Sequence, residues 1–360
     1  MMLTIYTLFN DPNIVNAVIQ RVLQTRKDTI YWQQYLDFRR TTTRVFKDYI
    51  GQVTGVMAGS INSRYGEKPI RERRNIGSGY GEIAYLGDRY QISVDRLSEL
   101  QDLIDKYNAA KPADQIAAMQ DIVNFIYDDY RQVLLAPHKR MDMVLGSMLM
   151  TGEATVKNKD DNAGGINLLE IKLPFKFITP ETEAKTKFIT YLQQKVNELK
   201  SIYGTFPKMI MSRGTFVKNI IGSEEFGDKF KMQLTGNEMY LSTGLITSQL
   251  ASSIFTGIGL PAIEIKEDYV LDQTGKNVQI YADDRITLLP RDKIGYMRFH
   301  TPYEAVDGVP GRNYTQADGE MLISGYKDGN GRYLEYTAEW IPQITNPNLI
   351  VNFDLSTMNA

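Results

Sequence analysis

The chain has 360 residues, of which 42% are hydrophobic and 23% are charged, and its formal net charge is −2. This nearly balanced charge excludes a protein that binds nucleic acid or an anionic membrane over its whole surface. The sequence holds no cysteine, which excludes disulfides, thiol catalysis and zinc–thiolate sites and fits assembly in a reducing cytoplasm. Neither a signal-peptide pattern nor an apolar run of about 18 residues occurs, so we predict no membrane span.

The first 44 residues are predicted to form an arm rather than a domain. Asp11 and Pro12 open a short helix, because aspartate is a preferred N-cap and proline is tolerated in the first turn. A strand rich in aromatic and β-branched residues follows over Ile30–Phe38. These elements hold too few apolar residues for a core of their own, so we expect segment 1–44 to lie against other parts of the protein.

Residues 45–92 are predicted to form an extended β-loop. Strand-like stretches occur over Tyr49–Met57 and Ile83–Ile92, and the sequence between them is rich in glycine and arginine. A lone hairpin is marginally stable in water, so we expect the loop to rest on another surface. The glycine run 77–81 lacks the preceding strand, the following helix and the lysine–serine ending of a phosphate-binding loop. We therefore predict no nucleotide site there.

A long amphipathic helix is predicted over about residues 113–150. Its apolar residues recur at spacings of three and four and define one buried face. Pro137 predicts a kink or a break, because proline removes a backbone donor and clashes with the preceding turn. Gly152 is expected to end the helix in the left-handed conformation. Asp128 and Asp129 are adjacent, so they do not face each other and fit a charged face better than an acid/base pair.

A β-hairpin is predicted after the helix, with a polar turn over 156–165 and a return strand over Ile166–Ile178. Asp160 and Asp161 lack the spacing of a calcium loop, which favours a solvated turn. Helices and strands then alternate up to about residue 300, and this order predicts a compact α/β domain over a central sheet. The expected helices are Thr179–Ile202, Gly214–Ile221 and Gly244–Phe255, and the expected strands are Lys208–Ser212 and Pro261–Ile265.

The C-terminal part of the chain is predicted to end in two strands. The stretch Tyr333–Trp340 alternates as a strand, and Pro342–Pro347 is expected to break it. The segment Leu349–Leu355 closes the chain as the last strand. A loop over residues 303–319 precedes these strands.

The sequence offers little for catalysis. His138 and His300 are the only histidines, and neither lies in a metal-ligand pattern. Asp283 and Asp284 lie at a strand edge, where a turn role is favoured. No cysteine nucleophile and no Gly-x-Ser-x-Gly elbow occur, so we predict that the protein is not an enzyme. Its 22 tyrosines and its protruding segments favour extensive contact between subunits.

The order of these parts resembles the major capsid proteins of tailed phages, most closely those of the lambda type, with the shared tailed-phage/herpesvirus capsid fold. Met150–Ala154 ends the long helix, as a similar Met-Thr-Gly segment does in that family. Tyr269–Pro290 is similar to the family's late turn and strand, and the glycine-rich hairpin looks like its extended loop. Ile341–Asn348 and the strand after it resemble the family's C-terminus. Pro137 departs from the family's straight helix.

The resemblance implies an α+β fold whose parts are an N-terminal arm, an extended β-loop, a peripheral domain with a long spine helix and a β-hairpin, and an α/β axial domain. The corresponding ranges are 1–44 for the arm, 45–92 for the loop, 93–178 for the peripheral domain, 179–300 for the axial domain, 301–345 for a return to the peripheral domain, and 346–360 for a C-terminal strand. Subunits of such a protein form hexamers and pentamers that close into an icosahedral capsid around the phage genome.

The resemblance also implies partners and a location. The partners are further copies of the chain, a separate scaffolding protein, a portal, decoration proteins, and packaged double-stranded DNA held without sequence-specific binding. The location is the virion capsid, after assembly in the host cytoplasm. No catalytic, cofactor or metal residue carries over. Residues proposed for subunit contacts, where exposed charge pairs are individually weak, are Arg64, Tyr65, Arg71, Arg73, Arg74, Tyr80, Asp128 and Asp129.

Two other classes of protein remain open at this point. One is another self-assembling virion part, such as a tail tube or sheath protein, which would usually lack a spine helix followed by an α/β domain. The other is an enzyme with an unrecognised site, which a ligand pocket with convergent polar groups would favour.

Overall fold

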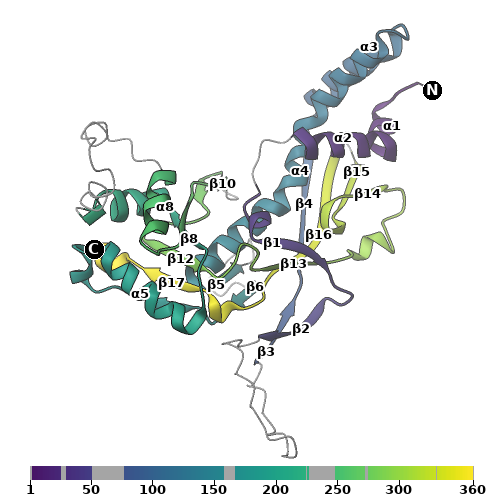
Figure 1. Ribbon diagram of the computed structural model, residues 1–360. Helices are drawn as coiled ribbons and strands as arrows, with labels where there is room; N and C mark the ends of the chain where they lie inside the picture. The colour runs from purple at the N-terminus through teal and green to yellow at the C-terminus, as the bar shows by residue number, and fades with distance from the viewer. Residues whose placement is uncertain are drawn as a thin grey trace, which may run out of the picture.

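The computed structural model describes residues 2–25, 30–50, 77–157, 167–223, 225–226, 248–271, 275–329 and 331–359. Two sheets lie on either side of one long helix, and several segments extend outward from this body (Figure 1). Residues 51–76 and 158–166, which include Asp160 and Asp161, lie outside the described part of the chain.

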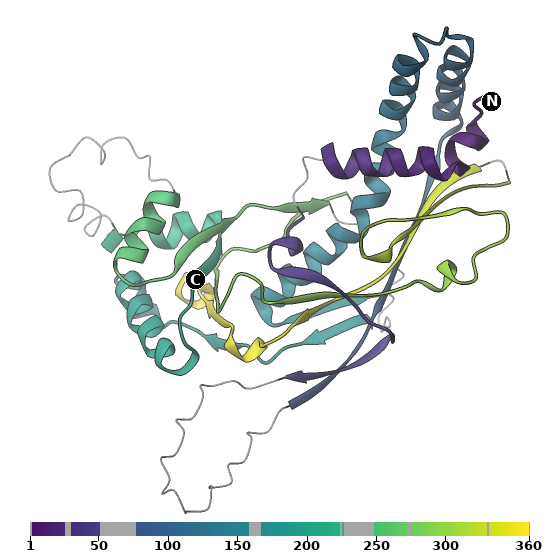
Figure 2. The ribbon, with the colours of Figure 1, turned by 45° about the vertical axis from the view of Figure 1, so that its right-hand side comes forward.

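The long helix is α4 (Gln115–Thr151), and it contacts both sheets. Gly152 ends it with φ of 70°, and the N–H of Gly152 donates to the carbonyl of Met148. The left-handed stop at Gly152 is thus confirmed. Of the kink or break predicted at Pro137, the break is wrong, because the helix continues through that residue. Buried residues flank the proline on both sides and hold both halves of the helix in one core, and Figure 2 shows the helix axis bending part way along.

The first sheet is built around the long strand β16 (Gly331–Ile344). On one side β16 pairs with β4 (Ala84–Ile92), and on the other side it pairs with β15 (Leu322–Asp328) and then with β13 (Gly295–His300). The sheet is completed by β1 (Leu36–Arg40), which lies beside β13, and by β14 (Tyr314–Gln316), which lies beside β15. Helices α1 (Ile5–Asn10), α2 (Pro12–Thr25) and α3 (Val94–Ala109) pack with α4 and this sheet.

Strand β16 does not break at Pro342, which corrects the sequence-based expectation. Pro342 lies opposite Met297 in β13, while the pairing of β16 with β4 ends at Trp340. The N–H of Thr345 donates to the carbonyl of Ile294, and hydrogen-bonded pairs alternate along an antiparallel ladder. The nitrogen of Pro342 therefore points away from β13, on the side where β4 is no longer present. A proline is tolerated in a strand at such a one-sided position.

The second sheet has the strand order β7, β17, β12, β8, β9. Alternate residues of these strands point to opposite faces, as the pleat requires. One face packs on the helices α5 (Phe188–Tyr203) and α8 (Ser248–Gly257), and the other faces the end of α4. The strands are β7 (Lys176–Ile178), β17 (Val351–Asp354), β12 (Arg285–Leu289), β8 (Lys208–Ser212) and β9 (Ala262–Lys266).

Three hairpins and several short helical turns complete the fold. The hairpin of β2 (Val45–Ile50) and β3 (Gly77–Glu82) extends from the body, and β5 (Glu153–Lys157) with β6 (Asn167–Lys172) follows α4 as predicted. The remaining elements are β10 (Tyr269–Leu271), β11 (Asn277–Gln279), α6 (Arg213–Thr215), η1 (Trp32–Gln34), η2 (Thr182–Lys185), η3 (Phe216–Ile221), η5 (Tyr303–Ala305), η6 (Asp318–Glu320), η7 (Pro347–Leu349) and α9 (Ser356–Asn359).

Some local predictions were wrong for identifiable reasons. The predicted strand Ile30–Phe38 begins instead with the 3₁₀ turn η1, because the carboxylate of Asp142 on α4 accepts a hydrogen bond from the N–H of Trp32. The predicted helix from Thr179 starts at Phe188, where the carboxylate of Glu225 accepts hydrogen bonds from the first backbone N–H groups.

Gly146 on α4 marks the closest approach of the helix to the chain beside β11. A Cβ atom placed on this glycine would lie 2.4 Å from the carbonyl oxygen of Ile280. Real Cβ atoms do not approach a backbone oxygen so closely, so the helix and the chain around Ile280 can pack as they do only if residue 146 has no side chain.

The change Gly146→Ala should lower the free energy of unfolding by roughly 1–3 kcal/mol, because the added methyl overpacks this contact. Helix propensity alone would raise it by about 1 kcal/mol. The control variant Ala117→Gly, at an exposed position of the same helix, measures the effect of helix propensity on the free energy of unfolding without a change in packing. Chemical denaturation of the three proteins checks this, and a stabilised Gly146→Ala protein would contradict the proposed contact.

Asp142 is a buried carboxylic acid in the middle of α4. Its side chain is fully buried, its Oδ1 accepts from the N–H of Trp32 at 2.9 Å, and its Oδ2 lies 3.4 Å from Nζ of Lys139. Burial raises the pKa of Asp142 to about 6, although these contacts oppose the rise. The folded protein therefore binds this proton more tightly than the unfolded chain does.

The change Asp142→Asn should stabilise the protein more at neutral pH than at acid pH. Because the folded pKa is raised, the stability contributed by Asp142 is present below its unfolded pKa of about 4 and is lost as the pH rises through about 6. As the pH rises from about 4 to about 7, the free energy of unfolding of the variant should increase by roughly 2 kcal/mol relative to that of wild type. Denaturation curves at both pH values test this, and a pH-independent difference would refute it.

Candidate functional site

The parts that extend from the body are the strongest candidates for contact with another molecule. The β2–β3 hairpin leaves the body at one end, and the antiparallel pair of α3 with the first turns of α4 extends at another (Figures 1 and 2). Near the far end of this pair Ile116 is 82% exposed, which is unusual for an isoleucine. These features provide surface that the single chain does not cover.

The base of the β2–β3 hairpin is attached to the first sheet by a buried carboxylate. Glu339 on β16 has a side chain that is 3% exposed, and it accepts hydrogen bonds from Nε and Nη2 of Arg44 at 3.1 and 2.6 Å. Its Oε2 also lies 2.8 Å from Nδ1 of His300 on β13. A bidentate pair of this kind fixes direction as well as distance. Glu339 therefore holds the first residue before the hairpin in a defined orientation.

The structure locates three of the residues that the sequence suggested for subunit contacts. Tyr80 belongs to β3, where it is opposite Lys47. Asp129 on α4 accepts from Nε of Arg96 on α3 at 2.9 Å, and Asp128 lies 4.0 Å from Arg131. The other five residues, Arg64, Tyr65, Arg71, Arg73 and Arg74, lie outside the described residues.

Asp129 connects two helices of one subunit. Its carboxylate is 23% exposed, and the Arg96 side chain that binds it also donates to the carbonyl of Phe125 at 2.7 Å. Burial raises the pKa of Asp129, and the hydrogen bond and charge of Arg96 act against that rise. Asp128 is the more exposed of the two, with 71% of its side chain accessible. Of the pair, Asp128 retains more surface for a contact with another subunit.

The histidines and the acidic pair do not form a catalytic arrangement. His138 is buried and stacks on Trp32 with ring centroids 5.7 Å apart, and His300 contacts Glu339. Asp283 lies 2.5 Å from the hydroxyl of Ser212, with no histidine beside them among the described residues. Asp284 has φ of 60° in the turn before β12, so the predicted turn role is confirmed.

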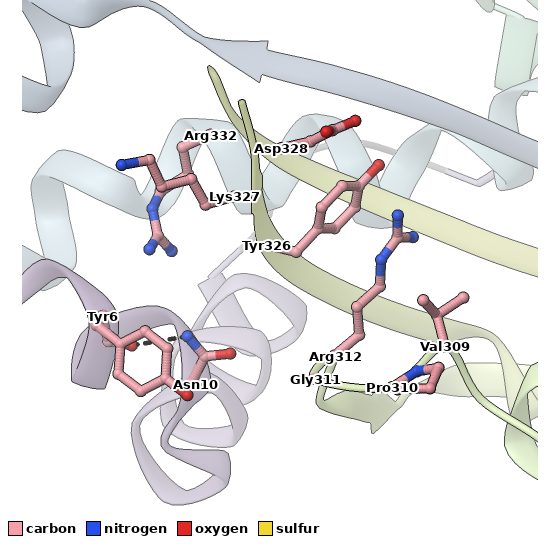
Figure 3. Close-up of a pocket in the computed structure, with 10 residues that line it drawn as sticks. All are labelled: Tyr6, Asn10, Val309, Pro310, Gly311, Arg312, Tyr326, Lys327, Asp328 and Arg332. Atoms are coloured by element: carbon pink, nitrogen blue, oxygen red, sulfur yellow. Dashed lines mark hydrogen bonds between the residues drawn. The ribbon is translucent and has the colours of Figure 1, made fainter. Parts of the chain in front are cut away.

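A pocket of about 390 Å³ lies at the end of β15 and β16, next to α1 (Figure 3). Its lining contains charged and aromatic side chains but no serine, cysteine or histidine that would act as a nucleophile with its base. Within the described part of the chain no cluster of three histidine or acidic residues suits a metal ion, and no helix is long and apolar enough to cross a bilayer. The lining residues are Tyr6, Asn10, Val309, Pro310, Gly311, Arg312, Tyr326, Lys327, Asp328 and Arg332.

A scan against protein-family models finds no match, and a search of curated proteins finds no relative. Solved structures do match. A protein assigned as the capsid protein of a prophage in E. coli CFT073 superimposes with a TM-score of 0.57 and 11% identity, over 96% of this chain and 98% of that chain. A phage-related protein from Bordetella bronchiseptica RB50 gives 0.49 and 9%, also over 96% and 98%. A chain of the satellite phage P4 procapsid gives 0.45 and 9%, over 94% and 98%.

The match to the prophage protein spans nearly the whole length of both chains, so the two share a fold. This protein therefore has the fold of phage capsid proteins, and the resemblance inferred from the order of sequence features is confirmed at the level of fold. Identity of 11% limits the conclusion to the fold, and function requires a separate argument.

We expect replacement of Arg44 and replacement of Glu339 to lower the free energy of unfolding by different amounts. Arg44→Met leaves a buried carboxylate with one fewer partner and should cost about 2 kcal/mol. Glu339→Gln leaves an arginine that is 53% exposed and can be hydrated, so it should cost only about 1 kcal/mol. The double variant should unfold close to Glu339→Gln alone. A double-mutant cycle measures these values, and a larger cost for Glu339→Gln than for Arg44→Met would contradict the assignment.

Proposed function

We propose that this chain is a structural protein of a tailed phage, which self-assembles as hexamers and pentamers into the icosahedral capsid that encloses the genome. The observation that carries the proposal is the fold match to the prophage capsid protein over 96% of this chain and 98% of the other. Coverage of nearly all of both chains supports the view that the extending hairpin and helices are part of the shared architecture.

The shape of the subunit supports this role on physical grounds. A closed shell needs each subunit to lay large surfaces across its neighbours, and obligate interfaces often exceed roughly 2,000 Å². The β2–β3 hairpin and the α3–α4 pair extend from the body and offer such surface (Figure 2). The near-neutral net charge of −2 suits a container whose wall should not bind DNA tightly.

The proposal divides the chain into the arm, the extended loop, and the peripheral and axial domains in the ranges given above. Strand β4 (Ala84–Ile92), at the end of the loop range, pairs with β16 and belongs to the first sheet. It places the protein in the virion capsid after assembly in the host cytoplasm, with a scaffolding protein, a portal and decoration proteins as partners. Packaged double-stranded DNA would lie inside without sequence-specific contacts. In this role the chain has no catalytic residue and no cofactor.

The subunit contacts proposed for the extended loop involve its arginines. Arg64, Arg71, Arg73 and Arg74 would pair with acidic residues of an adjacent subunit, with Tyr65 and Tyr80 adding contact area. The variant Arg73→Glu/Arg74→Glu should reduce the yield of particles while leaving the thermal unfolding of the subunit unchanged. Particle yield equal to that of wild type would remove this assignment.

The full-length protein should form particles without an added enzyme activity or ligand. We expect sedimentation velocity and negative-stain electron microscopy, on protein expressed alone and with the product of the gene just upstream, to show closed shells or hexamer-sized rings. The physical reason is that the surfaces left open in one subunit are buried only by others. Tubes would instead indicate a tail protein, and a monomer under every condition would overturn the proposal.

A further inference from the structure

The pocket at the end of β15 and β16 contains a buried cation that lacks an acidic partner. Arg332 is 6% exposed, and its guanidinium lies 4.8 Å from the centre of the Phe9 ring. Its Nη1 has no hydrogen-bond partner among the described residues. Burial lowers the pKa of Arg332, and no carboxylate of the described residues opposes that effect. A guanidinium desolvated in this way is unfavourable until an acceptor binds it.

A second cation lies directly beside Arg332. Lys327 is opposite Arg332 in the antiparallel register, so both side chains lie on one face of the β15–β16 hairpin. Like charges in this position repel each other. The carboxylate of Asp328 does not separate them, because it lies on the other face and is 3.9 Å from Arg89 (Figure 3).

The remaining cation of the pocket is already satisfied. The guanidinium of Arg312 lies 3.4 Å from the centre of the Tyr326 ring and 3.4 Å from the carboxylate oxygens of Glu335. Among the described residues of the pocket, the uncompensated positive charge therefore lies on the side that faces α1. In Figure 3 the guanidinium of Arg332 points toward Tyr6 and Asn10 on this side. The arrangement suits a carboxylate that enters between α1 and the hairpin.

The same chain presents unpaired carboxylates on another surface. Asp95, Glu99 and Asp102 on α3 are exposed, and their spacing of four and three places them on one face of the helix. Within the described part of the chain no basic side chain lies within 4.0 Å of these three carboxylates. Helix α3 belongs to the pair that extends from the body (Figure 2).

We propose that the Arg332 and Lys327 side of this pocket binds a carboxylate from the acidic face of α3 in a second copy of the chain. The proposal rests on the assembly function proposed above and deepens it. Because the pocket and the helix are different surfaces of one subunit, the contact is heterologous, and such contacts repeat around a ring when the rotation closes. Opposite charges at the contact fix which surfaces meet.

The first test separates a binding role of Arg332 from a structural one. Arg332→Met replaces the buried charge with an apolar side chain of similar length. The unassembled variant should unfold at the same or a higher denaturant concentration than wild type, while the concentration needed for assembly rises at least about fivefold. A structural role would lower stability and assembly together, and that result would overturn the proposal.

The second test exchanges the charges. We expect the concentration needed for assembly to rise at least about fivefold in Lys327→Glu and likewise in Glu99→Lys/Asp102→Lys. Combining these changes in one protein should bring that concentration most of the way back to the wild-type value. Lys187→Glu is the matched control, since Lys187 is an exposed lysine next to α5. Assembly of the first two variants at the wild-type concentration would overturn the proposal, as would a combined variant that is no better than either alone.

Three further results are informative about the proposal. If wild type forms particles and the variants assemble at the same concentration as wild type, this inference alone is overturned. If wild type forms no particles, the proposed function and the inference are both overturned. Duplex DNA that sediments with wild type but not with Arg332→Met would assign the site to phosphate and would also overturn the proposal.

Discussion

The contact between the last turns of α4 and the second sheet is the constraint on which the rest of this structure depends. The buried hydroxyl of Thr287 on β12 lies 3.0 Å from the carbonyl of Leu149 on α4, 2.6 Å from the hydroxyl of Tyr281 and 2.5 Å from Oδ1 of Asn352. The contacts of Thr287 are buried and paired, whereas Nδ2 of Asn352 has no hydrogen-bond partner among the described residues. Because buried polar groups are costly to leave unpaired, the paired part of this network permits few alternative arrangements. One turn earlier, Gly146 allows the helix to approach the carbonyl of Ile280.

Because α4 also packs along the first sheet, this contact fixes the two sheets relative to each other. Apolar side chains of α4, β16 and the N-terminal helices form one core, and the second sheet with α5 and α8 encloses another. Asp142 adds a polar link from α4 to the segment around Trp32, although burial disfavours its charge. A body held in this way can support extending segments without rearranging, as the proposed role in a shell requires.

The sequence predicted the elements that local chemistry determines. The three-and-four spacing of apolar residues indicated α4, and Gly152 indicated its end, because a glycine stop depends on backbone conformation alone. The continuation of β16 through Pro342 could not be predicted, since it depends on where β4 stops. Helix α1 was missed because it is six residues long, with only Leu8 and Phe9 buried.

In the candidate sites, too, some features follow from the local sequence and others depend on contacts between distant parts of the chain. The alternation along β16 places Arg332 at the end of an apolar row with Leu334 and Tyr336, a signal present in the sequence but without meaning until α1 covers that face. The partnership of Glu339 with Arg44 joins residues 295 positions apart, and no local pattern indicates it. Asp128 and Asp129 were recognised as part of a charged face, but only the fold shows that Asp129 binds Arg96 within the subunit.

The most direct test of the account is a cryo-electron microscopy map of the assembled particle, at a resolution that traces each chain. We predict a closed shell in which α4 joins the two sheets as described and the β2–β3 hairpin of each subunit lies on a neighbour. A particle whose hairpins fold back on their own subunits, or an open tube built from the same chain, would contradict it.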